Sequence, residues 1–132
     1  MGYAFESLCY KHIDAIKKAL GIGMVYTEIS TLRVPGTIDQ NGYQIDLIID
    51  RKDESINLCE IKFHGGPFLI DKKYYRELIQ KQQRFIEFTK TKKQVFLTFI
   101  TNHGVRENSY AGEIVDVEIT LENLINLSLI HI

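Results

Sequence analysis

The sequence contains no run of about 18 apolar residues, which excludes a conventional membrane-spanning helix. Its first residues enter an amphipathic pattern without a basic segment followed by an apolar stretch, so we expect no signal peptide. Glu6 stands where N-myristoylation of Gly2 requires serine or threonine, which argues against a lipid anchor. These absences predict a cytoplasmic protein that does not bind a membrane.

Cysteine is scarce, since Cys9 and Cys59 are the only two and lie far apart in the sequence. Two cysteines are too few for a disulfide framework or for a zinc site built from thiolates. Both stand in apolar patterns, so we expect them to be buried free thiols in a reducing compartment.

The chain also lacks an excess of charge of either sign, with 16 Lys and Arg against 17 Asp and Glu. Its 132 residues are 45% hydrophobic and 25% charged, which is typical of a soluble globular protein. The sequence shows no repeat and no low-complexity tract, so we expect a single domain spanning residues 1–132.

The charge is unevenly distributed along the chain. Residues 71–93 contain eight Lys and Arg against three Asp and Glu. A basic segment of this kind can contact phosphates, although a solvated helix face gives the same pattern. The candidate nucleic-acid contacts are Lys72, Lys73, Arg76, Lys81 and Arg84.

Apolar residues recur at helix and strand spacings along the chain. They predict helices at residues 3–20, 71–89 and 121–125, strands at 24–34, 43–50, 56–63 and 94–101, and an edge strand around Val115, Val117 and Ile119. Gly21 and Asp71 are the expected helix stop and N-cap, and 35–42 and 102–112 read as loops. The order αβββαβ predicts an α/β fold with a mixed sheet flanked by helices, in which strand 94–101 runs parallel to an earlier strand.

The two strands at 43–50 and 56–63 form a predicted β-hairpin. Symmetric pairing about Asp53 sets Asp46 opposite Glu60 and Gln44 opposite Lys62. Because side chains alternate between faces, Asp46, Glu60 and Lys62 share one face. The other face should carry the core residues Ile45, Leu47, Ile49, Cys59, Ile61 and Phe63.

Opposed carboxylates on one strand pair indicate metal chemistry. Directly opposite residues have Cβ atoms about 4.5–5.5 Å apart, where like charges repel, and Lys62 can neutralise only one of the two. Mg²⁺ resolves this conflict, because it prefers one or two carboxylates together with waters and phosphate oxygens. Such an ion activates water for phosphodiester hydrolysis, and Lys62 could hold that water or the pentacovalent phosphate.

An exposed strand with routine surface charges is the simpler interpretation of the same alternation. Two features weigh against it. Ile48 and Leu58 fall on the same face as the charged residues, so this face is not simply exposed to solvent. The order of elements also covers both faces of the sheet.

Ile45-Asp46, followed by Glu60-Ile61-Lys62 at the end of the next strand, resembles the motif of the PD-(D/E)XK nuclease superfamily. The chain is most similar to the nuclease-like domains at the C-terminus of certain bacterial AAA-type ATPases. The similar stretches cover residues 2–6, 44–51, 57–63, 96–101 and 117–124.

The resemblance implies a restriction-endonuclease-like fold and a Mg²⁺- or Mn²⁺-dependent DNA endonuclease. It makes Asp46, Glu60 and the backbone carbonyl of Ile61 metal ligands and Lys62 the catalytic lysine. It also makes Glu6 a helix carboxylate that positions metal or water; a solvent-facing residue beside the helix stripe is the alternative for Glu6.

The sequence departs from the family pattern in two respects. Ile45 stands where many members have proline, and no G-x-x-x-x-G-K-[ST] loop occurs, so the ATPase part is absent from this chain. The chain is then a fragment or a free-standing relative, with an ATPase domain or subunit as an expected partner. Three functions stay open: an endonuclease, in which a homodimer would cut both strands; an inactive module that binds nucleic acid or a partner; and a structural domain.

Overall fold

A computed structural model describes residues 2–129 of the chain. Its helices are α1 (Gly2–Lys11), α2 (Ile13–Ala19), α3 (Lys72–Thr89), α4 (Ser109–Ile114) and α5 (Leu121–Leu129), and its strands are β1 (Thr27–Val34), β2 (Tyr43–Arg51), β3 (Ser55–Lys62), β4 (Gln94–Thr101) and β5 (Val117–Thr120). Within residues 2–129 the strands form one five-stranded sheet in the order β1-β2-β3-β4-β5. The β1/β2 and β2/β3 pairs are antiparallel, whereas β3/β4 and β4/β5 are parallel.

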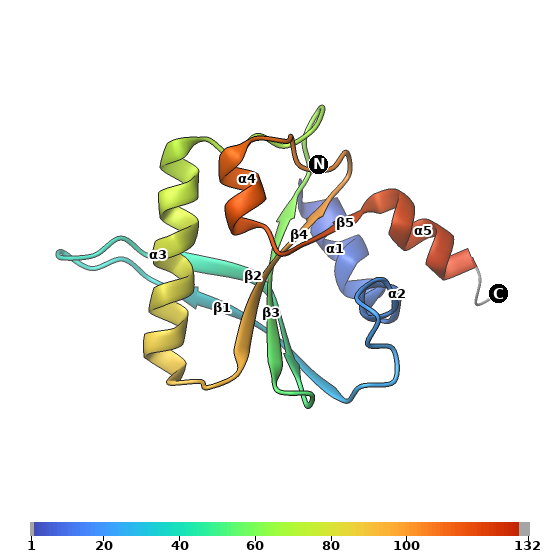
Figure 1. Ribbon diagram of the computed structural model, residues 1–132, viewed down its shortest axis with the longest axis horizontal. Helices are drawn as coiled ribbons and strands as arrows, with labels where there is room; N and C mark the ends of the chain where they lie inside the picture. Colours follow the sequence, from blue (N-terminus) through green and yellow to red (C-terminus); the bar gives the residue numbers. More distant parts are fainter. Residues whose placement is uncertain (1, 130–132) are drawn as a thin grey trace.

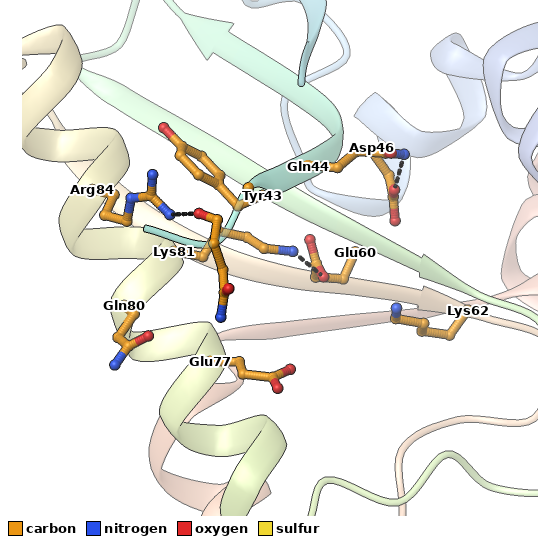
Figure 2. A pocket seen from close by; sticks show the side chains of 11 residues that line it. Tyr43, Gln44, Asp46, Glu60, Lys62, Glu77, Gln80, Lys81 and Arg84 are labelled. Carbon is orange, nitrogen blue, oxygen red and sulfur yellow. Dashed lines mark hydrogen bonds and ion pairs between the residues drawn. The ribbon is translucent and has the colours of Figure 1, made fainter. Parts of the chain in front are cut away.

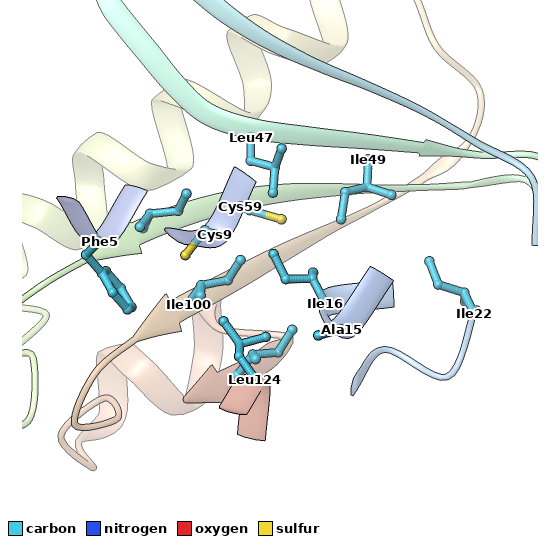
Figure 3. Close-up of a cluster of buried hydrophobic side chains, with 12 residues drawn as sticks. Phe5, Cys9, Ala15, Ile16, Ile22, Leu47, Ile49, Cys59, Ile100 and Leu124 are labelled. Atoms are coloured by element: carbon cyan, nitrogen blue, oxygen red, sulfur yellow. The ribbon is translucent and has the colours of Figure 1, made fainter. Parts of the chain in front are cut away.

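Helices cover both faces of this sheet (Figure 1). On one face, α1, α2 and α5 pack through a buried cluster that includes Phe5, Ile16 and Leu124 (Figure 3). On the other face, α3 and α4 pack through a second cluster that includes Leu78 and Ala111. The expected α/β class, a mixed sheet flanked by helices, is therefore confirmed.

Several local predictions are confirmed as well. Asp71 caps α3, since its carboxylate accepts the backbone N–H of Tyr74 at 2.8 Å. Gly21 has φ +76°, the left-handed conformation expected of a helix stop. Cys9 and Cys59 are buried free thiols. No helix in the described range is both long and apolar enough to cross a membrane.

The predicted helix 3–20 is interrupted, so that part of the prediction was wrong. His12 has φ −118° and ψ 37°, outside the helical region, and separates α1 from α2. The N–H of His12 donates to the carbonyl of Cys9, a tight turn that ends α1. Cys9 and Ile16, on either side of the break, belong to the same buried cluster.

Three further predictions need correction. The first strand begins at Thr27 and not at residue 24, because the preceding residues form turns and Met24 is fully exposed. The expected loop 102–112 contains the start of α4, where the Asn108 side chain caps the helix by accepting the N–H of Ala111 at 2.7 Å. Val115 follows α4 and lies outside the edge strand β5.

A bulge in β2 changes the direction of its side chains. The β1/β2 register pairs Ser30 with Ile48 but Leu32 with Ile45, so β2 contains one residue more than β1 over this interval. The extra residue lies at Asp46–Leu47. Because a bulge shifts the alternation by one, Ile45 joins Ile48 on the α3 side. The prediction that Ile45 shares a face with Leu47 was therefore wrong.

Candidate functional site

A pocket of about 500 Å³ lies between the start of β2, the end of β3 and helix α3 (Figure 2). It is lined by Asn41, Gly42, Tyr43, Gln44, Asp46, Glu60, Lys62, Glu77, Gln80, Lys81 and Arg84. The three hairpin residues singled out in the sequence, Asp46, Glu60 and Lys62, thus face one cavity. Two of the five basic candidates, Lys81 and Arg84, line it as well.

Glu60 is the most buried charged residue of the pocket, with 1% of its surface exposed. Its Oε1 accepts two hydrogen bonds, from the hydroxyl of Tyr74 at 3.0 Å and from Nζ of Lys81 at 2.9 Å. Its Oε2 is buried and has no partner among the described residues. Burial raises the pKa of Glu60, the charge of Lys81 opposes this shift, and the charge of Asp46 adds to it.

Asp46 is half-buried and held by the backbone of the neighbouring strand. Its Oδ2 accepts the N–H of Ile61 at 2.8 Å, and its Oδ1 accepts the side-chain amide of Gln44 at 3.1 Å. The β2/β3 ladder follows the predicted symmetric register from Asp50 opposite Ile56 to Leu47 opposite Cys59. It ends there, so the predicted direct pairing of Asp46 with Glu60 is absent. At this point the bulged strand turns Asp46 toward the backbone of β3 instead.

Glu6 lies on α1 near Asp46 and Lys62 but does not line the pocket. Partial burial raises the pKa of Glu6, and the charge of Asp46 raises it further while that of Lys62 lowers it. Among residues 2–129 no three His, Cys, Asp or Glu side chains gather closely enough to form a ready-made metal-binding group. Glu6 therefore does not complete a three-carboxylate site here.

Lys62 shares the pocket with Glu60, but among the described residues it does not form an ion pair with it. Its ammonium lies 5.7 Å from the ring centre of Phe68 and 5.2 Å from that of Tyr74, distances at which an aromatic face attracts a cation. Both rings belong to an aromatic cluster with Phe99. The rings position the ammonium of Lys62, and no ion pair found among the described residues involves it.

The other basic candidates have different surroundings. Arg84 donates to the carbonyl of Asn41 at 2.6 Å and stacks 4.4 Å above the ring of Tyr43, so it ties the β1–β2 connection to α3. The β1–β2 connection extends past α3 to the left of Figure 1. Lys72, Lys73 and Arg76 are exposed near the start of α3 and lie outside the pocket.

Sequence reasoning did not assign a role to Tyr74 or find the ion pair made by Lys81. A signal for both was present, because Tyr74, Leu78 and Lys81 follow one another at steps of four and three residues and so share one face of α3. That face is the one against the sheet, since Leu78 is fully buried. A lysine at this position needs a partner for its charge, and the buried acid that it reaches is Glu60.

Comparisons with known proteins bear on the fold. No family model matches the chain, and no curated protein matches it. Among solved structures, it is similar to the crystal structure of a protein of unknown function, AF1548, with a TM-score of 0.52 and 19% sequence identity. The match covers 89% of this chain and 65% of that one, so the chain spans slightly less than two thirds of that protein. At this identity the likeness concerns the fold alone.

Proposed function

We propose that this chain is a Mg²⁺- or Mn²⁺-dependent DNA endonuclease domain of the PD-(D/E)XK type. One observation carries the proposal: the buried Oε2 of Glu60 has no partner among the described residues, in a pocket that Asp46 and Lys62 also line. An unpaired buried acceptor costs free energy, and a hard divalent cation is a ligand that recovers it.

The donor set fits such a cation. Mg²⁺ takes one or two carboxylates from a protein and keeps waters and phosphate oxygens as its remaining ligands, so three converging acids are not required. Glu60 and Asp46 are the proposed carboxylates, and the family resemblance adds the carbonyl of Ile61 and the more distant Glu6. When bound, the ion supplies a water of lowered pKa and neutralises negative charge on the phosphate.

The residues of the chain position the reacting groups. The N–H of Ile61 fixes one oxygen of Asp46, and the hydroxyl of Tyr74 fixes one oxygen of Glu60. The rings beside Lys62 hold its ammonium at the pocket without neutralising it. We propose that this ammonium contacts the phosphate oxygen on which negative charge develops. A preorganised donor of this kind stabilises the transition state.

Binding of the DNA phosphate backbone requires positive charge around the pocket. Lys81 and Arg84 line the pocket, and Lys72, Lys73 and Arg76 continue along the exposed side of α3. Phosphate contacts supply much of the affinity of DNA-binding proteins and make that affinity fall with salt. We therefore propose that the basic side chains of α3 contact the phosphate backbone of DNA.

A module that binds nucleic acid or a protein partner without cleaving DNA is the second candidate. The ion pair between Lys81 and Glu60 favours it, because this pair partly neutralises the buried carboxylate without a metal. An ATPase domain or subunit is the partner that the family resemblance suggests for such a module.

Plasmid cleavage separates the two candidates. We expect the purified chain to convert supercoiled plasmid to nicked or linear DNA with Mg²⁺ or Mn²⁺. Chelation of the metal and the variant Glu60→Gln should each abolish the conversion, because the amide cannot replace an anionic ligand. A binding module would retard DNA in a salt-sensitive manner without any cleavage. Undiminished cleavage by Glu60→Gln would contradict the assignment.

A second test of Glu60 as a metal ligand repeats the plasmid-cleavage assay from about pH 5 to about pH 8. Burial raises the pKa of Glu60 above its ordinary value of 4.5, so a larger fraction of this carboxyl is protonated at the acidic end of the range than for an exposed glutamate. A protonated carboxyl does not bind the cation, and the rate should rise with pH as Glu60 ionises. A rate independent of pH over this range would argue against Glu60 as a ligand.

A further inference from the structure

Glu60 already has a positive charge beside it, and this charge comes from α3. Nζ of Lys81 lies 2.9 Å from Oε1 of Glu60, and the two side chains are 17% and 2% exposed. Tyr74 donates to the same oxygen at 3.0 Å. One oxygen of the carboxylate therefore has two donors, while the other has none among the described residues.

We propose that Lys81 is a displaceable counterion, which neutralises Glu60 until a divalent cation binds and then pairs with the phosphate of the substrate. The inference rests on the proposed function, because it assigns a second role within the same pocket. Burial of an uncompensated carboxylate is costly, so the metal-free pocket needs an internal positive charge. Lys81 supplies it.

The release of Lys81 follows from the charges in the pocket. Without metal, the ammonium of Lys81 pairs with Glu60 in a pocket that the negatively charged Asp46 also lines. A divalent cation bound to both carboxylates cancels those two charges, so most of the attraction that holds Lys81 disappears. Lys62 is not released in the same way, because aromatic rings and not a carboxylate hold it.

The ammonium of Lys81 has a second position available in the pocket, near Glu77. Glu77 precedes Lys81 by four residues on α3, the spacing at which opposite charges pair along a helix. Both side chains line the pocket, and Figure 2 shows them rising from successive turns of α3. A phosphate entering there is an acceptor for a charge-assisted hydrogen bond from the released ammonium.

The consequence is a coupling between metal and DNA. Lys81 opposes the binding of metal alone, because the metal must replace an existing ion pair. It favours the binding of DNA once the metal is present. A single side chain thus makes the two ligands cooperative, and the metal-free pocket keeps its lysine away from phosphates.

Titration calorimetry with Mg²⁺ tests the first half of this coupling on the wild type, Lys81→Met, Lys81→Arg and Lys92→Met. The measurements are made at about pH 8.5, because a carboxyl whose pKa is raised by burial is more fully ionised there than at neutral pH. Circular dichroism checks that each variant is folded. Lys92 is an exposed lysine outside the pocket, so Lys92→Met removes the same charge elsewhere.

We expect Lys81→Met to bind Mg²⁺ about tenfold more tightly than the wild type, within the usual range of coupling between two sites. Lys81→Arg and Lys92→Met should stay close to the wild type. With a short DNA duplex and Ca²⁺ in place of Mg²⁺, the gain in DNA affinity caused by the metal should be smaller in Lys81→Met.

Unchanged or weaker Mg²⁺ binding by a folded Lys81→Met would overturn the counterion role and leave the metal site standing. The absence of Mg²⁺ binding from the wild type and from every variant would overturn the metal site as well. The two failures are therefore distinguishable.

Discussion

The variant Lys62→Met is expected to cleave DNA about 10²–10³ times more slowly than the wild type, the usual cost of removing one preorganised donor to a developing anion. Methionine keeps an unbranched apolar stem against the rings of Phe68 and Tyr74, so the fold should change little. Only the ammonium is lost. Single-turnover cleavage of plasmid with saturating Mg²⁺ measures the effect on the chemical step.

The exposed residue Lys92 provides the matched control, because Lys92→Met removes one positive charge away from the pocket. It should reduce DNA affinity at most slightly and should not change the single-turnover rate. Equal rates for Lys62→Met and Lys92→Met would remove Lys62 from the proposed reaction.

The variant Phe99→Ala is expected to lower the free energy of unfolding by about 3–5 kcal/mol, the typical cost of removing a large aromatic side chain from a core. Phe99 is 0% exposed and stands opposite Glu60 in the β3/β4 ladder. Its ring centre lies 6.0 Å from that of Phe68 and 6.4 Å from that of Tyr74, the two rings beside the ammonium of Lys62. Urea denaturation followed by circular dichroism measures the loss.

Phe88 gives the matching substitution on the surface, since it is 69% exposed. Phe88→Ala should change stability by less than about 0.5 kcal/mol. Similar losses for the two variants would mean that the aromatic cluster below the pocket is not part of a packed core.

The hairpin could be predicted closely because its determinants are local. A short connection sets the pairing of two antiparallel strands, and the register from Asp50 opposite Ile56 to Leu47 opposite Cys59 followed from it. The parallel strand β4 followed from an apolar run after a helix. These features depend on residues near each other in the sequence.

The bulge at Asp46–Leu47 was not predictable from alternation alone. It depends on the fit between β2 and β1, where Thr31 stands against two residues. The bulge moves Ile45 to the α3 side, and within it the side chain of Asp46 accepts the N–H of Ile61. Bulges commonly redirect side chains beside functional sites, and this one turns a candidate metal ligand.

The placement of Asp46, Glu60 and Lys62 around one pocket could be anticipated from strand periodicity, whereas their partners could not. The ion pair of Glu60 joins residues 21 positions apart, on β3 and α3. It depends on how α3 packs on the sheet, which strand spacing does not specify. The short helix α4 was missed for a different reason, since its six residues are too few to show a clear period.

Calorimetric titration of Mg²⁺ into the wild type and into Asp46→Asn is the sharpest test of the proposed metal site, since it examines the pocket before any substrate is chosen. We expect one Mg²⁺ per wild-type chain and at least about tenfold weaker binding by Asp46→Asn, because the substitution replaces an anionic ligand with a neutral amide. Equal binding by the two proteins, or no binding by the wild type, would contradict it.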